Sequence, residues 1–346
     1  MSGGVAMETG ERRNPYLFIV GCPRSGTTLL QRMLDHHPEL AVVNEARFIP
    51  LAISEAPEGV DQRLAPLDPR DATGGIDPPL APEHVERARS YKRFPRLGLP
   101  ETAVREAAST ARSYGEFVDT IFSEFGRLQG KPLAGDKSGF YCLYVPLLRT
   151  LLPWVKFIHI IRDGRDVTLS VLEWARKREK GPRRFSLWRE EPIATSALWW
   201  RWYVTEGRRH AAELGPGRYC EVQYETLVAN PEETLREVTG FLELPFAPEM
   251  LAYHEGKTRR KRGLSSKKKW LPPTEGLRSW QTNMTERNVE LFEAIAGDLL
   301  STLGYKRAVD SVSPQVSEVA ERCESWWRTE MERIRTIATG SSKGPS

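Results

Sequence analysis

The chain has few cysteines and no long apolar run, and each shortage excludes a class of protein. Four cysteines are scattered through 346 residues without a C-x-x-C pair, which argues against a zinc site and a disulfide framework. No apolar stretch approaches the roughly 20 residues that a membrane-spanning helix needs. Residues 1–14 are polar and glycine-rich, without the apolar core of a signal peptide. We therefore expect a cytoplasmic protein in a reducing compartment, with no membrane span.

The net charge is small, although charged residues are abundant. The formal charge is +4, with 28% charged and 40% hydrophobic residues, which is the balance of a globular protein. The cations are clustered, which indicates anionic ligands more than general nucleic-acid affinity, so no nucleic-acid partner is expected. The length suits one large α/β domain with additions, or two ordinary domains.

The first informative stretch is a strand, a glycine-bounded loop and a helix. Tyr16–Val20 is a short apolar run typical of a buried parallel strand. The loop Gly21–Thr28 (GCPRSGTT) follows, and a helix is expected over Thr28–His37. Backbone N–H groups of such a loop, together with the helix N-terminus, favour a phosphate. The loop fits G-x-x-x-x-G-K-[ST], except that Thr27 replaces the lysine used for nucleoside triphosphates and Arg24 supplies the positive charge instead.

A second strand runs into a second charged turn. Val155–Ile161 predicts a buried strand, and the turn Arg162–Asp166 (RDGRD) leads into a helix. Arg162 and Ser170 could reach one anion, because a planar guanidinium suits phosphate. Alternatively, the acidic and basic residues of the turn pair with one another and cap the helix. Two such sites in one chain imply a ligand with two phosphates in different places.

Three further charged residues follow predicted strands. Glu45 and Arg47 come just after a short strand at Ala41–Val43, and Lys137 ends a strand within residues 131–138. Open α/β sheets bind ligands at the carboxyl ends of their strands. A lysine there can neutralise a transferring group. A surface Glu–Arg pair and a surface lysine are the plain alternatives.

The rest of the chain predicts helices around this core. They include Tyr141–Leu152, Tyr114–Leu128 with an inward stripe of Phe117, Val118, Ile121, Phe122 and Phe125, and Ile193–Arg209, in which core packing is expected for Trp199, Trp200, Trp202 and Tyr203. Residues 50–130, proline-rich and then helical, are expected to form a cap over the sheet. Eight of the thirteen residues in 257–269 are cationic, which fits a loop over a polyanionic small molecule, a nucleic-acid arm or a solvated loop. A long helix at 316–337 could pack on the domain or on a second copy, giving a homodimer. The predicted fold class is α/β, a three-layer P-loop-type parallel sheet flanked by helices, with a helical and irregular cap.

Together these motifs resemble the sulfotransferases that use 3′-phosphoadenosine 5′-phosphosulfate (PAPS), most closely the branch with the protein-tyrosine sulfotransferases and their bacterial relatives. The resemblance runs from about Pro15 to Tyr305 and is scattered through residues 50–130. Pro23–Thr28 is similar to the loop for the 5′-phosphosulfate, and Phe157–Ser170 is similar to the 3′-phosphate site. The two phosphate motifs in this order make the resemblance strong.

The resemblance implies roles for individual residues. Glu45, in a Glu-x-Arg-x-Ile-Pro segment, matches the catalytic base, and Lys137 matches a lysine that assists transfer, although Lys-Ser-Gly stands here for Lys-Asp-Pro. Tyr224 begins a segment similar to one that contacts the adenine side. A late Leu-Ser-Lys-Trp segment appears as Leu277–Trp280 (LRSW), so Arg278 would have to replace its lysine. The implied catalytic residues are Glu45, Lys137 and Arg24. The implied donor-binding residues are Arg24, Ser25, Gly26, Thr27, Thr28, Arg162, Ser170, Tyr224, Arg278 and Ser279.

The resemblance also implies the organisation and the reaction. We expect a disordered segment 1–14, a sulfotransferase domain 15–305 with a variable substrate cap at 50–130 and the basic loop 257–269, and a helical extension 306–346. Glu45 would take a proton from an acceptor hydroxyl, or as second choice an amine, while PAPS becomes adenosine 3′,5′-bisphosphate without a metal. The expected acceptor is a small carbohydrate, lipid or natural-product alcohol.

Two other functions remain open from the sequence. The first is a nucleotide kinase or nucleoside triphosphatase with a degenerate phosphate loop. Thr27 speaks against it, and so does the lack of a clear acidic strand end for a metal. The second is a non-catalytic adaptor that binds a nucleotide and uses the basic run to hold an acidic partner.

Overall fold

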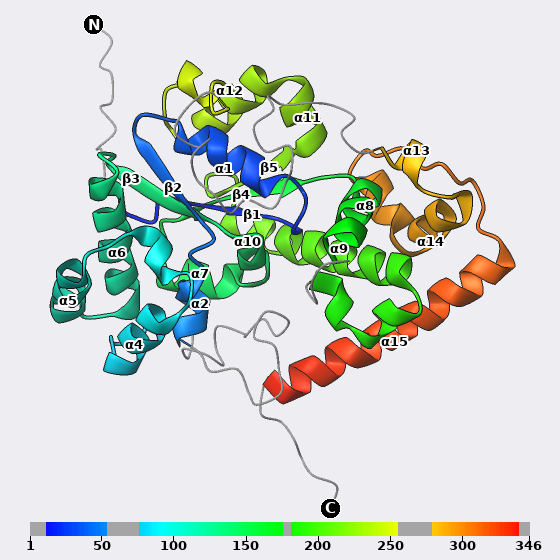
Figure 1. Ribbon diagram of the computed structural model, residues 1–346, viewed down its shortest axis with the longest axis horizontal. Coiled ribbons are helices and arrows are strands. Elements are labelled where there is room, and N and C mark those ends of the chain that lie inside the picture. The colour runs from blue at the N-terminus through cyan, green and yellow to red at the C-terminus, as the bar shows by residue number, and fades with distance from the viewer. Residues whose placement is uncertain (1–11, 54–75, 176–180, 255–278, 339–346) are drawn as a thin grey trace, which may run out of the picture.

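The computed structural model describes residues 12–53, 76–175, 181–254 and 279–338, and a parallel sheet lies at its centre. The strands are β1 (Leu17–Val20), β2 (Leu40–Asn44), β3 (Leu133–Lys137), β4 (Lys156–Ile161) and β5 (Tyr219–Gln223). They lie in the order β2-β3-β1-β4-β5, and all their pairings are parallel (Figure 1). The central strands β1 and β4 are buried along their whole length, as their apolar sequences predict.

Helices cover both faces of this sheet, because the residues of each strand alternate between two cores. Leu17 and Ile19 of β1 pack in one core, and Phe18 and Val20 pack in the other. The first core is covered by α1 (Thr27–Asp35), α11 (Tyr224–Ala229) and α12 (Pro231–Phe241). The second is covered mainly by α6 (Tyr114–Leu128), α7 (Val145–Leu151), α8 (Gly164–Ala175), α9 (Pro192–Arg209) and α14 (Glu286–Thr302). The predicted three-layer α/β fold is therefore confirmed.

The segments that follow the strands all emerge at one edge of the sheet. β1 runs into the glycine-bounded loop and α1, and β4 runs into the charged turn and α8. β2 leads to the short helix α2 (Phe48–Ile53), and β5 leads directly to α11. Lys137 ends β3. Parallel strands present all their carboxyl ends together, so the candidate residues from all five strands meet at this edge.

The described residues 76–132, between β2 and β3, form a helical layer beside the sheet, on the side of α2 and α7 (Figure 1). It contains α4 (Pro82–Ser90), the 3₁₀ turn η1 (Phe94–Leu97), α5 (Glu101–Thr110) and α6. Helix α6 has the predicted bounds and buries its predicted apolar stripe: Phe117, Val118, Ile121, Phe122 and Phe125. Most of the proline-rich segment 55–82 lies outside the described residues.

One predicted helix is broken in two. The stretch 141–152 forms the 3₁₀ segment η2 (Gly139–Leu143) and then α7. Pro146 lies in the first turn of α7, where its missing N–H costs nothing. The same proline could not continue an α-helix from upstream, because it cannot donate to the preceding turn.

The later helices complete the second core. The remaining short elements are η3 (Gly181–Arg184), η4 (Ser186–Arg189), α10 (Ala211–Leu214), η5 (Pro248–Met250) and α13 (Trp280–Asn283). Helix α15 (Pro314–Ala338) packs along α14 and α9, and Trp327 at its middle touches Phe185 at 4.7 Å between ring centroids. Its apolar stripe is therefore covered within the chain. Trp199, Trp200, Trp202 and Tyr203 of α9 are buried, as predicted. No described helix is long and apolar enough to cross a membrane.

Candidate active site

The loop between β1 and α1 depends on two glycines. Gly21 and Gly26 have φ of 142° and 93°, a region that L side chains rarely adopt. A Cβ on Gly21 would lie 2.4 Å from the Ile160 carbonyl oxygen, and one on Gly26 would lie 2.2 Å from the Tyr224 ring. Arg24 also has a positive φ of 83°. The loop is therefore a close-fitting turn, in which the backbone lies directly against β4 and the start of α11.

The residues of the two predicted anion sites lie side by side. The Nε of Arg24 donates to the Ser170 hydroxyl on α8 at 2.9 Å. The Arg162 guanidinium lies over the Tyr224 ring, 4.3 Å from its centroid, and the same ring packs against Gly26. Sheet order explains the meeting, because β1 and β4 are neighbours and β5 lies beside β4.

Buried polar atoms at this site fit an anionic ligand. The Ser25 hydroxyl and the Nε of Arg162 are buried without a hydrogen-bond partner among the residues that the structure describes. Such groups are costly to leave unsatisfied, so a ligand that accepts from them would be stabilised. Thr27 begins α1 and Thr28 follows it, so both sit where the loop meets the helix N-terminus.

The alternative of a self-paired turn after β4 also holds in part. Arg162 pairs with Asp166 at 3.2 Å, while its Nε stays unpartnered. Arg165 is 1% exposed and is held by Asp163 at 2.7 Å and by Glu293 of α14 at 2.6 Å. The second arginine of the turn therefore fixes the start of α8 against α14. The first arginine, Arg162, keeps its Nε available for a ligand at the sheet edge.

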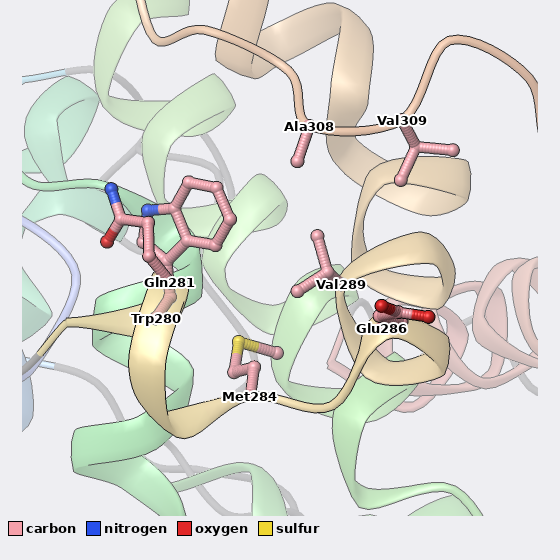
Figure 2. A pocket seen from close by; sticks show the side chains of 7 residues that line it. All are labelled: Trp280, Gln281, Met284, Glu286, Val289, Ala308 and Val309. Carbon is pink, nitrogen blue, oxygen red and sulfur yellow. The ribbon is translucent and has the colours of Figure 1, made fainter.

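Trp280 borders a cavity that is lined by α13, the start of α14 and the segment at residues 308–309 (Figure 2). The cavity has a volume of about 190 Å³, and Figure 2 shows Met284, Val289 and Ala308 around the same space as the indole. The backbone N–H of Trp280 donates to Asp166 at 2.9 Å, which links this segment to the turn of Arg162. Ser279 precedes Trp280, and its hydroxyl contacts Gln281. Donor binding by Ser279 stays a prediction.

Two sequence predictions lie outside the described residues. These are the replacement of the family lysine by Arg278 and the role of the basic run 257–269. Among the described residues, no group of three or more His, Cys, Asp and Glu side chains could hold a metal ion.

Glu45 lies among four cations at the end of β2. Its carboxylate is 2.8 Å from Arg47 and 3.4 Å from the Nζ of Lys137, and it also contacts Arg93. Arg96 approaches to 3.9 Å. The expected surface pair of Glu45 and Arg47 exists, but it belongs to a larger cluster that includes the buried Lys137, which is 3% exposed.

Arg93 and Arg96 were missed by sequence reasoning. Arg93 directly precedes η1 and Arg96 lies within it, about fifty residues after Glu45 in the chain. Two arginines in a basic stretch carry no signal that they reach a particular carboxylate. Only the packing of the helical layer against the end of β2 brings them there.

The charges around Glu45 set its protonation. Burial alone would raise the pKa of Glu45, but Lys137, Arg47 and Arg93 together hold that pKa well below its ordinary value. Burial lowers the pKa of Lys137, although Glu45 opposes the shift. Glu45 is therefore an ionised carboxylate that can only accept hydrogen bonds.

The Glu45 cluster adjoins the glycine-bounded loop. The Ser138 N–H donates to the Ile19 carbonyl oxygen at 3.0 Å, and a Cβ on Gly139 would lie 2.4 Å from the Gly21 carbonyl oxygen. The residues directly after Lys137 thus pack on the start of the loop. The arrangement places a carboxylate and an ammonium beside the candidate anion site, which suits the transfer of an anionic group to a nucleophile that must lose a proton.

Comparisons with known proteins agree with this chemistry. A putative protein-tyrosine sulfotransferase from Caenorhabditis briggsae is 25% identical over 318 residues, covering 88% of this chain and 93% of its own length. Protein-tyrosine sulfotransferase A from Caenorhabditis elegans is 26% identical over 300 residues, covering 85% and 68%. The solved sulfotransferase domain of the Synechococcus PCC 7002 olefin synthase has the same fold, with a TM-score of 0.54 at 23% identity, covering 88% of this chain and 99% of that domain. A model described as the sulfotransferase family matches residues 15–248, more than half of the chain, which is therefore a sulfotransferase and a member of that family.

Proposed function

We propose that the enzyme transfers the sulfuryl group of PAPS to an acceptor hydroxyl, with Glu45 as general base. The observation that carries the proposal is the facing pair of Glu45 and Lys137, 3.4 Å apart, at the ends of β2 and β3. The residues that follow β3 pack on the start of the glycine-bounded loop. A base and a cation are needed together when one oxygen loses a proton while another gains charge.

Each end of the donor has candidate partners. Arg24, the Ser25 hydroxyl and the loop N–H groups would hold the 5′-phosphosulfate, where charge grows as the bond to sulfur breaks. Arg162 and Ser170 would hold the 3′-phosphate, and Tyr224, whose ring lies under the Arg162 guanidinium, would pack on the adenine side. The contact between Arg24 and Ser170 supports one ligand that spans both halves.

The transfer balances without further reactants. The acceptor oxygen forms a bond to sulfur, the bond between sulfur and the 5′-phosphate oxygen breaks, and the acceptor proton goes to Glu45. Lys137 would neutralise the sulfuryl oxygens or the departing phosphate oxygen. Without a donor the cations suppress the basicity of Glu45, and an anionic phosphosulfate would draw part of their charge away. Glu45 would thus become a better base when the donor is bound.

Calorimetry separates this proposal from the kinase alternative. We expect tight binding of adenosine 3′,5′-bisphosphate without metal, and weaker binding of ATP with magnesium. Arg162→Met should weaken the first, whereas Arg208→Met, which removes an ion pair with Glu221 on the protein surface, should not. A preference for ATP with magnesium would overturn the proposal.

Turnover tests the base and the adaptor alternative. Labelled PAPS and a working acceptor should give sulfated product, and Glu45→Ala should lower kcat by roughly 10²- to 10⁴-fold, the usual contribution of a general base. Full turnover by Glu45→Ala would remove Glu45 as base. Binding of the nucleotide with no sulfate transfer to any acceptor would favour the adaptor.

For the acceptor we propose a small carbohydrate, lipid or natural-product alcohol. The relatives named protein-tyrosine sulfotransferases add a tyrosine phenol as the second candidate. A panel containing all of these, including a tyrosyl peptide, decides between them by incorporation of label. All four cysteines are unpaired, which supports the proposal of a cytoplasmic protein.

The proposed organisation follows the same plan. Residues 15–305 would form the transfer domain, with the variable cap at 50–130 and the basic loop at 257–269, and 306–346 would be a helical extension. The contacts of Arg93 and Arg96 with Glu45 support a cap that reaches the reaction centre. A homodimer is also proposed, and sedimentation of the full chain tests it.

A further inference from the structure

Asp136, next to Lys137 on β3, is a buried carboxylate with no role in the proposed chemistry so far. It is 0% exposed. One of its oxygens accepts from the backbone N–H of Ala46 at 3.1 Å, and the other accepts from the N–H of Arg47 at 3.2 Å. Both oxygens are therefore directed at the turn that carries the candidate base.

That turn has an unusual backbone. Glu45 and Arg47 have φ of 63° and 59°, which non-glycine residues adopt only when their surroundings hold them there. The Glu45 N–H donates to the Lys137 carbonyl oxygen at 2.8 Å, so the turn stays tied to β3 on one side. Asp136 supplies the next two hydrogen bonds, and it lies opposite Val43 in the sheet register.

These contacts decide where the Glu45 side chain points. A left-handed residue at the end of a strand departs from the alternation of side chains that an extended chain would have. The Glu45 carboxylate consequently faces Lys137. Lys137 is the last residue of the neighbouring strand β3 and lies opposite Asn44 in the sheet register. Without the carboxylate of Asp136, two buried N–H groups would lack a partner and the turn could relax.

We propose that Asp136 is a positioning residue that holds the backbone of residues 45–47 so that Glu45 meets the acceptor hydroxyl beside Lys137. The proposal rests on the proposed function of Glu45 as base. Asp136 acts through the backbone and touches neither donor nor acceptor.

The main test is Asp136→Asn, which keeps the shape but loses one acceptor oxygen. We expect kcat to fall by roughly 10²-fold, the cost of misplacing a catalytic group by about 1 Å. The affinity for adenosine 3′,5′-bisphosphate should stay within about twofold, because the variant leaves the donor loop intact. The matched control is Asp35→Asn. The Asp35 carboxylate accepts from the N–H of Val42 at 2.9 Å, and Val42 lies on β2, the strand that precedes the turn, but away from the turn itself. It should lower Tm without changing kcat.

A double-mutant cycle separates positioning from general stability. In a Glu45→Gln background, Asp136→Asn should reduce the residual turnover no further, because nothing remains to be positioned. Amide exchange of the wild type is a second measurement that needs no variant. The Ala46 and Arg47 N–H groups should exchange slowly.

Three results would overturn the inference. These are wild-type kcat in Asp136→Asn, an equal loss of turnover in the Glu45→Gln background, or fast exchange at Ala46 and Arg47. If Glu45→Gln itself retains full turnover, the proposed base fails and the inference fails with it. A large loss in Glu45→Gln with none in Asp136→Asn would remove the inference alone.

Discussion

Glu45 shows how one side chain can satisfy both a structural and a catalytic interpretation. Its pair with Arg47 is an ordinary ion pair. The additional contacts with Lys137 and Arg93 make Glu45 the centre of a positively charged cluster. The Glu45 side chain itself is 25% exposed. A cluster of excess positive charge around one carboxylate attracts a further anion, and a phosphosulfate is such an anion.

The pKa of Glu45 predicts the pH dependence of the reaction. Because the neighbouring cations lower that pKa in the free enzyme, Glu45 stays ionised as the pH falls, and kcat/KM should show no loss from its protonation down to about pH 5. Arg93→Gln removes one cation and should move the acid limb up by about one pH unit. Arg105→Gln, on the surface of α5, is the control and should leave the profile unchanged. If the acid limb lies at the same pH in Arg93→Gln and in the wild type, the assignment of Glu45 as the base is contradicted.

Ser170 tests the 3′-phosphate site at the level of one hydroxyl. Ser170→Ala should weaken binding of adenosine 3′,5′-bisphosphate by roughly 10-fold or more, as expected for a hydrogen bond to a charged group. Binding of adenosine 5′-phosphate, which lacks the 3′-phosphate, should change little. Calorimetry with both nucleotides measures the difference. An equal loss of affinity for the two nucleotides would mean that Ser170 only holds Arg24 in place and does not bind the 3′-phosphate.

At the scale of elements, the loop between β1 and α1 works because it fits against its neighbours. Its glycines allow the backbone to lie directly against the β4 carbonyl and the Tyr224 ring. The same closeness brings the Arg162 guanidinium over that ring. The strand-loop-helix unit would therefore form the proposed donor site only in combination with β4, α8 and α11.

Gly26→Ala tests this fit. The new Cβ would clash with the Tyr224 ring, so the loop or the ring must move, and binding of adenosine 3′,5′-bisphosphate should fall by at least about 10-fold, the loss of one charged hydrogen bond. Gly130→Ala is the matched control, because Gly130 has a positive φ of 70° but no atom within 4 Å of its Cβ position. It should cost about 1–2 kcal/mol of stability and leave binding unchanged. Similar binding losses in both variants would mean that backbone strain, and not the clash, is responsible.

At the scale of the whole molecule, the C-terminal helix α15 is part of the second core. It buries Trp327 against Phe185 and Trp202, with ring centroids 4.7 Å and 6.1 Å away. Its Cys323 is 0% exposed. The helix therefore stabilises α9, the helix whose Trp200 donates to the carbonyl oxygen of Arg162.

Trp327→Ala should destabilise the protein by about 3–5 kcal/mol, as for a buried aromatic residue in a close-packed core. Trp326, its partly buried neighbour, is the control, and Trp326→Ala should cost less. Denaturant unfolding followed by circular dichroism measures both. Small, equal losses would show that α15 does not share the core.

Much of the fold was predictable because its signals are local. The apolar runs of β1 and β4, the glycine-bounded loop and the stripe of α6 each lie within about fifteen residues of sequence. The break between η2 and α7 was missed, although Pro146 carried the signal. The strand order follows from no single stretch, since it depends on how the whole chain packs.

The family, the two charged strand-to-helix motifs and the strand ends that carry charged residues could be read from the sequence, because they depend on short-range pattern and backbone chemistry. The contacts of Arg24 with Ser170, of Arg93 with Glu45 and of Asp136 with the turn after β2 depend on the tertiary structure. Those contacts join residues 48 to 146 positions apart. The order of the strands and the packing of the helices bring such residues together. Both depend on burial of the whole core, so the sequence around the contacting residues does not show which of them will meet.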